Sequence, residues 1–449
     1  MKLSTLILAA GLGTRMKSSL PKVLHKLLGQ PMAWFTLQAA SQVSSGKPLM
    51  VVGFGADLVQ KELGNQAEYV IQETLLGTGH AVMQAEPMLG VKSELLLVIY
   101  ADMPLLTGDT LARLVEKAES NNGPVTMLTV TTEETRGFGR ILRDPDGQVN
   151  GIVEEVAASP EQLKIHELNP GVYCFRTSWL WTALKRLTVS PKGEYYLTDL
   201  VSLAVADSYP VASLAVDDPL EVIGINTRIH LAQAEALLRK RINDKWMLAG
   251  VTMVNPDQTY IEPGVTLGQD TILWPGTYLH GSTHIGTGCV IGPDTIITDT
   301  QVGDNCTLLA SVLESAELED NVEMGPYCHL RKGAHLSSGV HMGNFGEVKN
   351  STLGPGTKMG HFSYMGDAQV GANVNIGAGT ITCNFDGTRK SPTVIGEGAF
   401  LGSDTMLVAP VKIGAGARTG AGAVVTRDIP PQTLAVGVPA RVIKELKEG

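Results

Sequence analysis

The chain has 449 residues, of which 43% are hydrophobic and 18% charged. This composition excludes a chain that is disordered throughout, and the length fits two or three domains of about 150 residues each. The formal net charge of −10 is a poor fit to nonspecific binding of nucleic acid or of an anionic membrane surface. No apolar run approaches the ~18 residues of a membrane span, so we expect no nucleic-acid partner and no membrane insertion.

The first 225 residues alternate short apolar runs with longer amphipathic segments. Predicted strands cover Leu3–Ala9, Leu49–Val52, Leu95–Ile99 and Val125–Val130, and a predicted helix covers Gly108–Glu119. The first run could imitate a signal peptide, but its apolar core is short and leads into a glycine-rich basic segment, so a buried strand is expected. The alternation predicts an α/β domain with a largely parallel sheet.

A different pattern follows between residues 227 and 249. Its apolar residues recur at spacings of three and four, which predicts one long helix that Gly250 ends. They are Leu231, Ala234, Leu238, Ile242 and Trp246. We interpret the segment 227–250 as a linker helix between a domain of residues 1–226 and a second domain of residues 251–449 that ends in a C-terminal arm.

The second domain shows a six-residue rhythm. Of the 50 glycines, 30 lie in residues 251–449, and aliphatic residues recur at 324, 330, 336, 342 and 348 and again at 395, 401, 407 and 413. A hexapeptide period held this long is typical of a parallel β-helix, in which three hexads close one coil of a triangular prism and the repeated aliphatic residue points inward. Known hexapeptide-repeat proteins wind left-handed, and that resemblance implies the same handedness here.

The cysteines predict reduced thiols. They are Cys174, Cys289, Cys306, Cys328 and Cys383. Their odd number and the absence of a C-x-x-C pair argue against a disulfide framework or a structural zinc site. We therefore expect mostly buried, reduced cysteines in a cytoplasmic protein.

A glycine-rich turn follows the first predicted strand. Gly11 and Gly13 permit a tight turn whose N–H groups face an anion. No G-K-[S/T] follows, so this is not a P-loop, and such turns are more often structural. Arg15 and Lys22 flank the turn with two cations, which favours a triphosphate.

Asp102 follows the apolar run that ends at Tyr100. The carboxyl end of a buried parallel strand is where α/β proteins bind ligands, and a carboxylate there can hold Mg²⁺. Alone, such an Asp is equally often a cap or turn residue.

The first domain resembles sugar-phosphate nucleotidyltransferases, and in particular the uridylyltransferase half of a bifunctional family. The resemblance rests on G-L-G-T-R-M with L-P-K-V-L-H, Q-E-T-L-L-G-T-G-H-A (72–81), Y-A-D-M-P-L (100–105), G-F-G-R-I (137–141), G-I-V-E (151–154), L-N-P-G-V-Y (168–173), G-E-Y-Y-L-T-D (193–199) and V-I-G-I-N-T-R (222–228). It implies a Rossmann-like nucleotidyltransferase domain.

The resemblance also implies a set of ligand contacts. The residues that would bind UTP or UDP-N-acetylglucosamine are Leu8, Ala9, Ala10, Gly11, Lys22, Gln72, Gly77, Thr78, Tyr100, Ala101, Asp102, Gly139, Glu154, Asn169 and Asn226. Within this set Asp102 and Asn226 would bind Mg²⁺. Lys22, together with Arg15, would neutralise phosphates in catalysis.

In the second domain Arg331 and Lys349 are 18 residues apart, one full coil. They should therefore be neighbours on one side of the prism, about 4.8 Å apart at the backbone. Like charges in that register repel each other, and an anion between them removes the conflict. Two solvated surface cations are the plainer alternative.

The histidines divide into two cases. His329, His335 and His341 are six apart, which puts them on three different sides, so they should not chelate one ion. His361 lies within about a coil of the cation pair, where it is a candidate general base rather than a structural histidine.

A loop should leave the prism where the rhythm is lost, between Ile376 and Ile395. Such a loop could cover a ligand or reach a neighbouring subunit. Further on, Ser403 and Ala421 are again 18 apart, and small residues stacked there would admit a long, thin ligand.

This half resembles the acetyltransferase half of the same bifunctional family, through G-P-Y-C-H-L-R-K-G-A (325–334), G-N-F-G-E-V-K-N (343–350), G-H-F-S-Y-M-G-D (360–367), N-I-G-A-G-T-I-T-C-N-F-D-G (375–387) and F-L-G-S-D-T-M-L-V-A-P-V (400–411). The resemblance implies acetyl transfer from acetyl-CoA to glucosamine 1-phosphate, with His361 as catalytic base. The sugar-phosphate contacts would be Arg331, Lys349, Tyr364, Asn375 and Lys390. The acetyl-CoA contacts would be Ala378, Asn384, Phe385, Ser403, Ala421 and Arg441.

Two positions depart from the family pattern. Many relatives have tyrosine where Phe385 stands, so a hydroxyl contact is lost. In some relatives an arginine stands where Gly437 aligns, and Arg441 is the candidate to replace it.

Together with the residue patterns, the resemblance implies a cytoplasmic, homotrimeric, bifunctional enzyme that makes UDP-N-acetylglucosamine, a precursor of peptidoglycan and lipopolysaccharide. It would use acetyl-CoA, UTP and Mg²⁺. One alternative is a monofunctional sugar-phosphate nucleotidyltransferase whose β-helix only trimerises. Another is a non-catalytic assembly protein built from the same two folds.

Overall fold

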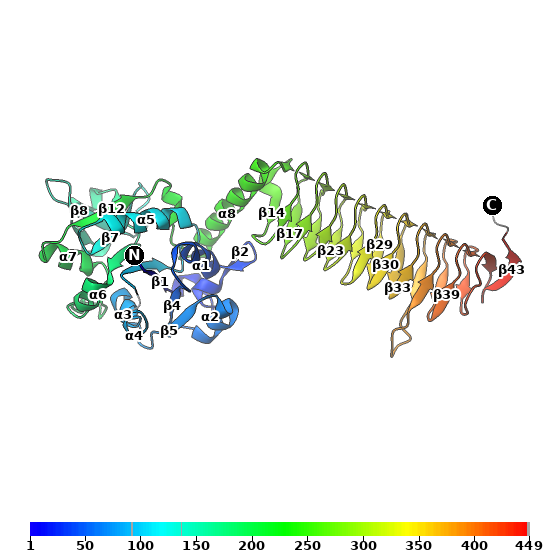
Figure 1. Cartoon of the computed structure of the whole chain (residues 1–449), viewed down its shortest axis with the longest axis horizontal. Coiled ribbons are helices and arrows are strands. Elements are labelled where there is room, and N and C mark those ends of the chain that lie inside the picture. Colours follow the sequence, from blue (N-terminus) through cyan, green and yellow to red (C-terminus); the bar gives the residue numbers. More distant parts are fainter. Residues whose placement is uncertain (91–92, 136, 447–449) are drawn as a thin grey trace. The chain divides into compact units, whose positions relative to one another are not determined.

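The structure is a computed structural model that describes residues 1–90, 93–135 and 137–446 (Figure 1). Contacts divide the chain into two compact units, Met1–Leu238 and Arg239–Gly449. The division falls inside one helix, α8 (Arg228–Leu248), which is the long helix that the spacing predicts. The three-part division at 226 and 250 stays a prediction.

The N-terminal unit is built on a ten-stranded sheet in the order β5-β4-β1-β6-β11-β7-β10-β8-β9, with β12 beside β7. Its strands are β1 (Leu3–Leu8), β4 (Leu49–Val52), β5 (Glu68–Ile71), β6 (Leu95–Tyr100), β7 (Val125–Thr131), β8 (Gly139–Arg143), β9 (Val149–Val153), β10 (Glu167–Asn169), β11 (Tyr173–Arg176) and β12 (Val211–Ala215). The four strands predicted from apolar runs, β1, β4, β6 and β7, are confirmed.

The expectation of a largely parallel sheet is correct for only part of it. Strands β5, β4, β1 and β6 are parallel neighbours, but β11 runs antiparallel to both β6 and β7. Strands β8, β9 and β10 are also paired antiparallel. The short turn Asp144–Gln148 joins β8 to β9 and allows only antiparallel pairing, because parallel strands need a long crossover.

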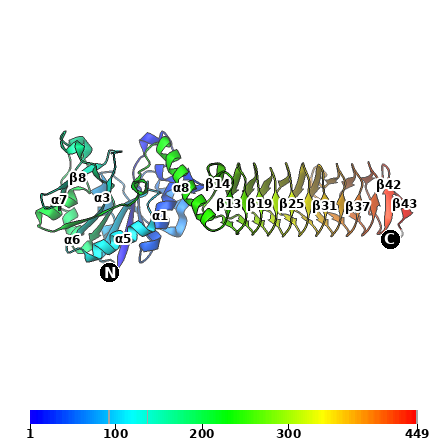
Figure 2. The same cartoon turned by 90° about the horizontal axis from the view of Figure 1, so that it is seen from above.

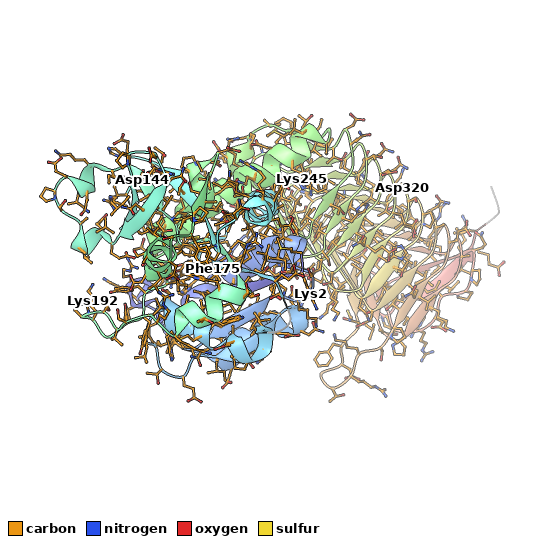
Figure 3. The ribbon with its side chains drawn as sticks, turned by 60° about the vertical axis from the view of Figure 1, so that its left-hand side comes forward. Lys2, Asp144, Phe175, Lys192, Lys245 and Asp320 are labelled. Atoms are coloured by element: carbon orange, nitrogen blue, oxygen red, sulfur yellow. The ribbon has the colours of Figure 1, made fainter. Side chains whose placement is uncertain are left out.

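Helices cover both faces of this sheet and bury two hydrophobic clusters. One face carries α1 (Met32–Val43), α2 (Ala56–Leu63) and α5 (Gly108–Ser120); the other carries α3 (Thr78–Met83), α4 (Glu86–Leu89), α6 (Thr177–Leu184) and α7 (Asp199–Ala206). Phe175 is fully buried in the second cluster, whereas Lys192 lies at the surface (Figure 3). The unit is therefore a three-layer α/β domain, with α5 where the sequence predicts a helix.

The C-terminal unit is a parallel β-helix whose coils stack along one axis (Figure 2). Its three sides are sheets of twelve, ten and nine strands. All nine residues of the two predicted aliphatic runs, at 324–348 and 395–413, are buried. Leu330 pairs with Val348 across one coil of 18 residues, but Met342 pairs with Met359 and Val302 with Leu318. Some coils are therefore one or two residues shorter than three full hexads.

Helix α8 ends against the first coil. Gly250 has a φ of 99°, and its N–H donates to Met247 O while the N–H of Val251 donates to Trp246 O. These bonds satisfy the last carbonyls of the helix, as the glycine predicts. Ile242, Trp246 and Met247 pack against the β-helix core.

The predicted loop leaves the prism between β35 (Ile381–Cys383) and β36 (Thr393–Ile395), and it projects from the coils in Figure 1. Its two arms are joined by a bridge between Phe385 and Lys390. The five cysteines are free thiols, four of them buried and Cys383 partly buried, as predicted. Among the described residues, no helix has the length and apolar character needed to cross a membrane.

Candidate functional site

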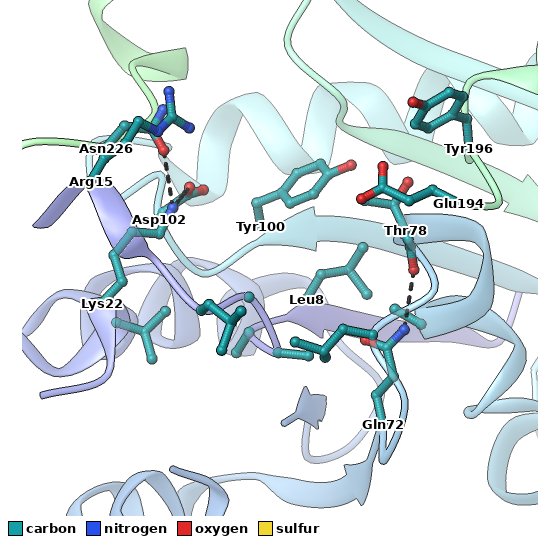
Figure 4. A pocket seen from close by; sticks show the side chains of 18 residues that line it. Leu8, Arg15, Lys22, Gln72, Thr78, Tyr100, Asp102, Glu194, Tyr196 and Asn226 are labelled. Carbon is teal, nitrogen blue, oxygen red and sulfur yellow. Dashed lines mark hydrogen bonds and ion pairs between the residues drawn. The ribbon is translucent and has the colours of Figure 1, made fainter. Parts of the chain in front are cut away.

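The N-terminal unit contains a cavity of about 540 Å³ at the carboxyl ends of β1 and β6 (Figure 4). Its lining residues are Leu8, Ala9, Ala10, Gly11, Leu12, Arg15, Lys22, Val23, Gln72, Leu75, Gly77, Thr78, Ala81, Tyr100, Asp102, Glu194, Tyr196 and Asn226. The carboxyl edge of parallel strands is where open α/β sheets bind ligands. The glycine-rich turn and the two cations of the sequence prediction thus lie at one cavity.

Gly13 lets Lys22 reach this cavity. Its φ is 63°, and a Cβ atom at this position would lie 2.5 Å from Lys22 Cβ. Any larger side chain would therefore displace the stem of Lys22 as well as strain the turn. The 3₁₀ turn η2 (Lys22–Leu24), which follows Pro21, fixes the backbone of Lys22.

Lys22, Asp102 and Asn226 meet at one end of the cavity. Lys22 Nζ lies 2.5 Å from Asp102 Oδ2 and 3.2 Å from Asn226 Oδ1. The N–H of Ile225 donates to Asp102 O at 2.9 Å and holds the two segments together. Two hard oxygen ligands thus converge on one cation, which is the donor set that Mg²⁺ takes in proteins, so Asp102 and Asn226 fit a divalent metal ion.

Gln72 lies at the other end of the cavity (Figure 4) and is buried. Its amide nitrogen donates to Gly77 O at 3.1 Å and lies 3.0 Å from His80 Nδ1. A carbonyl can only accept, so the amide nitrogen faces Gly77 and the amide oxygen is left for a ligand. Gly77 has a φ of 94°, and a Cβ there would lie 2.7 Å from Tyr195 O.

A second cavity of about 290 Å³ shares Thr78, Tyr100, Asp102, Tyr196 and Asn226 with the first. Its other lining residues are Met103, Gly137, Phe138, Gly139, Glu154, Asn169, Pro170, Gly171, Thr198 and Gly224. The two cavities are neighbouring parts of one cleft. Gly139, Glu154 and Asn169, which by resemblance would bind UTP or UDP-N-acetylglucosamine, all line this second part.

Hydrogen bonds orient the polar groups of this second cavity. Thr198 Oγ1 donates to Glu154 Oε1 at 3.0 Å, and the amide nitrogen of Asn169 donates to Tyr173 Oη at 2.7 Å. Burial raises the pKa of Tyr100, so its hydroxyl stays protonated as a donor. The cavity therefore offers both acceptors and donors, as recognition of sugar hydroxyls requires.

Of the ligand contacts that the resemblance implies in this unit, only Ala101 lines neither cavity. It is fully buried, and its N–H donates to Leu8 O, so its assignment stays a prediction. Conversely, Glu194, Tyr196 and Thr198 line the cleft and had no predicted role. The motif G-E-Y-Y-L-T-D that contains them was the available signal.

The β-helix places Arg331 beside Lys349, as predicted. The register pairs Leu330 with Val348, and the N–H of Arg331 donates to Val348 O. Arg331 Nη1 also lies 3.0 Å from Glu347 Oε1, a partner that spacing did not indicate. The pKa of Lys349 is lowered first by Arg331 and then by Lys390, so both other cations lie close enough to act on Lys349. We call Arg331, Lys349 and Lys390 the cation cluster.

Tyr364 and Asn384 lie beside the cation cluster. Tyr364, on β32 (Ser363–Gly366), pairs with Glu347, and a Cβ on Gly366 would meet both the Tyr364 hydroxyl and the Asn384 amide within 3 Å. Asp367 accepts from Asn384 Nδ2 at 2.6 Å. Asp367 therefore fixes the side chain at the base of the projecting loop.

His361 lies exposed at the corner before β32. Corner residues of the next coils follow it: Gly379 donates to Phe362 O, Asp404 to Ala378 O, and Gly422 to Ser403 O. His361, Ala378, Ser403 and Ala421 are thus on one edge of the prism, which we call the corner strip. Its small residues leave room for an extended ligand along the edge.

Within one chain, three of the predicted residues do not lie together with the cation cluster and the corner strip. Asn375 is on β34 (Asn375–Ile376) and Arg441 on β43 (Arg441–Glu445), both in the twelve-stranded side, whereas Arg331 and Lys349 belong to the ten-stranded side. Phe385 is exposed on the projecting loop.

The described residues contain no group of three or more metal-ligating side chains. His329, His335 and His341 belong to β26 (His329–Leu330), β27 (Ala334–Leu336) and β28 (His341–Met342) on three different sides. Each contacts a glutamate instead, namely Glu314, Glu319 and Glu323. The prediction that they lie on three different sides of the prism is confirmed.

Comparison with known proteins agrees with the two folds. A family model described as nucleotidyl transferase matches residues 4–247, and one described as bacterial transferase hexapeptide (six repeats) matches residues 264–299 and 392–427. The fold and the sites define a class of transferase that joins a nucleotidyltransferase domain to a left-handed β-helix of hexapeptide repeats.

Curated relatives align over almost the whole chain. A Bifunctional protein GlmU of Trichlorobacter lovleyi is 46% identical over 98% of this chain and 97% of its own. Proteins of the same name from Heliobacterium modesticaldum and Exiguobacterium sibiricum are each 45% identical, over 99% and 96% of this chain and 97% and 96% of their own. This chain therefore belongs to the GlmU family of bifunctional proteins.

Proposed function

We propose that the two units catalyse consecutive steps toward UDP-N-acetylglucosamine. The β-helix unit acetylates glucosamine 1-phosphate with acetyl-CoA. The N-terminal unit then transfers UMP from UTP to N-acetylglucosamine 1-phosphate and releases pyrophosphate. Membership of a family of bifunctional transferases over the full chain supports both activities.

In the uridylyl step an oxygen of the sugar phosphate attacks the α-phosphorus of UTP, and the bond to pyrophosphate breaks. Gln72 and Gly77 bind the uracil, and Gly139, Glu154 and Asn169 bind the sugar. Lys22 and Arg15 neutralise the phosphates, since two anions must approach each other. Asp102 and Asn226 would hold Mg²⁺, which neutralises charge on the transferred group when bound.

In the acetyl step the amine of glucosamine 1-phosphate attacks the thioester carbonyl of acetyl-CoA, the carbon–sulfur bond breaks, and CoA leaves as a thiolate that takes up a proton. His361 removes the ammonium proton so that the nitrogen becomes nucleophilic. The cation cluster binds the phosphate, and Tyr364 lies on the coil that follows Lys349. Acetyl-CoA lies along the corner strip, with Asn384 at its boundary.

We further propose that the enzyme acts as a homotrimer in the cytoplasm, where UTP and acetyl-CoA are made. Asn375 and Arg441 belong to a different side of the prism from the cation cluster, so a neighbouring copy is needed to bring such residues to one site. Tyr327, Phe345 and Phe362 are each more than half exposed, and the Tyr327 and Phe345 rings stack 5.4 Å apart. This aromatic edge beside His361 suits contact with a second copy.

The cation cluster is the observation that carries the bifunctional reading over a β-helix that only trimerises. A scaffold has no need of two further cations placed so close to Lys349 that they lower its pKa. The test is an assay of the purified chain with glucosamine 1-phosphate, acetyl-CoA, UTP and Mg²⁺, scored for free thiol and pyrophosphate. If no thiol is released, and pyrophosphate appears only when N-acetylglucosamine 1-phosphate is supplied, the monofunctional alternative is correct.

A further inference from the structure

Lys22 occupies the point on which both proposed metal ligands converge. Its ammonium lies 2.5 Å from Asp102 Oδ2 and 3.2 Å from Asn226 Oδ1. The side chains of Lys22 and Asp102 are only 14% and 19% exposed. In this structure the ammonium of Lys22 therefore neutralises the Asp102 carboxylate, which is the group that would bind a metal ion.

An ammonium and a divalent cation cannot share this position. At a few ångströms the repulsion between them exceeds thermal energy even with the screening typical of a protein surface. Solvent screens this mostly buried pair less than an exposed one. A metal ion that reaches Asp102 must therefore displace Lys22 Nζ, which then needs another anion.

The packing of Lys22 allows such a displacement of the ammonium alone. Cβ, Cγ and Cδ of Lys22 lie within 3.3 Å of the position that a Cβ on Gly13 would take, so the stem is held against the turn. Displacing the ammonium therefore needs rotation only beyond Cδ, together with loss of its contacts to Asp102 and Asn226. Gly11 and Arg15 line the same cavity, on the side where the sequence predicts the phosphates.

We propose that Lys22 keeps the metal position closed until a nucleotide phosphate draws its ammonium away, so that the metal ion enters with the nucleotide. This inference rests on the proposed nucleotide and metal assignment. Asp102 then always has one cation partner, Lys22 before the nucleotide binds and the metal ion afterwards. Lys22 thereby controls the order in which the nucleotide and the metal ion bind, and it also neutralises the phosphates.

The test is Mn²⁺ binding to the full-length, nucleotide-free chain, with free Mn²⁺ counted by electron paramagnetic resonance. We expect Lys22→Met to bind Mn²⁺ at least about tenfold more tightly than the unchanged chain, because no ammonium has to be displaced. Lys22→Gln, a second neutral variant, should behave likewise. Arg15→Met is the matched control: it removes a cation from the same cavity but not from Asp102, and should change the affinity much less.

A double variant, Lys22→Met with Asp102→Asn, assigns the gained binding to this position and should lose it. The proposal is overturned if Lys22→Met and Lys22→Gln bind Mn²⁺ no more tightly than the unchanged chain while Asp102→Asn weakens binding in the presence of UTP. If Asp102→Asn has no effect even with UTP, the metal assignment itself is wrong. A gain in Arg15→Met equal to that in Lys22→Met would also overturn the proposal, because general charge would explain both.

Discussion

Arg331 and Lys349 lie in register on adjacent coils of the β-helix, Arg331 directly after β26 and Lys349 at the end of β29 (Gly346–Lys349). Arg331 forms an ion pair with Glu347, whereas the pKa of Lys349 is lowered by Arg331 and Lys390. The repulsion is therefore concentrated on Lys349. A dianionic phosphate would relieve it.

Lys349→Met should stabilise the folded chain at neutral pH while raising KM for glucosamine 1-phosphate. Because the pKa of Lys349 is lower in the folded chain than its ordinary 10.5, protonation opposes folding at pH 7. That cost fades as pH rises through the folded-state pKa. The gain in Tm over the unchanged chain should therefore shrink between pH 7 and pH 10.

Lys358→Met is the control for this prediction, because Lys358 is an exposed lysine on β31 (Lys358–Met359), on another side of the prism. It should leave KM unchanged. A Lys349→Met variant that is less stable than the unchanged chain at pH 7 would contradict the repulsion.

His361→Ala and Arg331→Ala should separate catalysis from binding. Loss of the general base should lower kcat for acetyl transfer about 10²–10⁴-fold. Loss of Arg331 should mainly raise KM for the sugar phosphate, because its charge acts before and during the reaction. Steady-state kinetics on both variants decide this, and near-normal kcat in His361→Ala would leave His361 as a structural residue of its corner.

Asp386 should hold the projecting loop that carries Lys390. Its Oδ1 accepts from the N–H groups of Thr388 and Arg389, each at 2.8 Å, and these bonds lower its pKa to about 2. Stabilisation by this carboxylate is thus present at neutral pH and is lost progressively as pH falls from the ordinary pKa of 3.8 to about 2. Asp386→Ala should speed tryptic cleavage after Arg389 and raise KM for glucosamine 1-phosphate.

Asp386→Asn keeps an acceptor at Oδ1 and is the matched control for the loop. It should be cleaved at nearly the rate of the unchanged chain. Equal cleavage of all three proteins would mean that the turn does not depend on Asp386.

Two corner glycines should differ in their tolerance of a methyl group. A Cβ on Gly343 would lie 1.9 Å from Gly360 O, whereas a Cβ on Gly360 would meet nothing within 4 Å. Gly343→Ala should therefore destabilise the β-helix by about 1–3 kcal/mol through overpacking. Gly360→Ala should leave stability unchanged or slightly higher, as thermal unfolding of the two variants would measure.

The sequence predicted the β-helix down to individual residues because its repeat is local. The inward positions from Met324 to Val348, the Arg331–Lys349 register and the projecting loop all follow from counting along the chain. Counting did not predict the shorter coils, such as that from Val302 to Leu318, because corners can lose a residue without changing the inward pattern.

The N-terminal site was less accessible to the same reasoning. The Gly11–Gly13 turn and Asp102 were found because each follows an apolar run. The contact of Lys22 with Asp102 joins residues 80 apart in sequence, and no local pattern encodes it. The antiparallel part of the sheet was missed because apolar runs identify strands without giving their direction.

The central claim is that one chain carries two separate activities, and mixing two variants tests it most directly. Asp102→Ala should release CoA but almost no pyrophosphate, and His361→Ala should do the reverse when given N-acetylglucosamine 1-phosphate. Supplied with glucosamine 1-phosphate, acetyl-CoA, UTP and Mg²⁺, neither variant alone should make UDP-N-acetylglucosamine, but an equal mixture should. Loss of both activities in Asp102→Ala, or a mixture that makes no product although each variant retains its own step, would contradict the account.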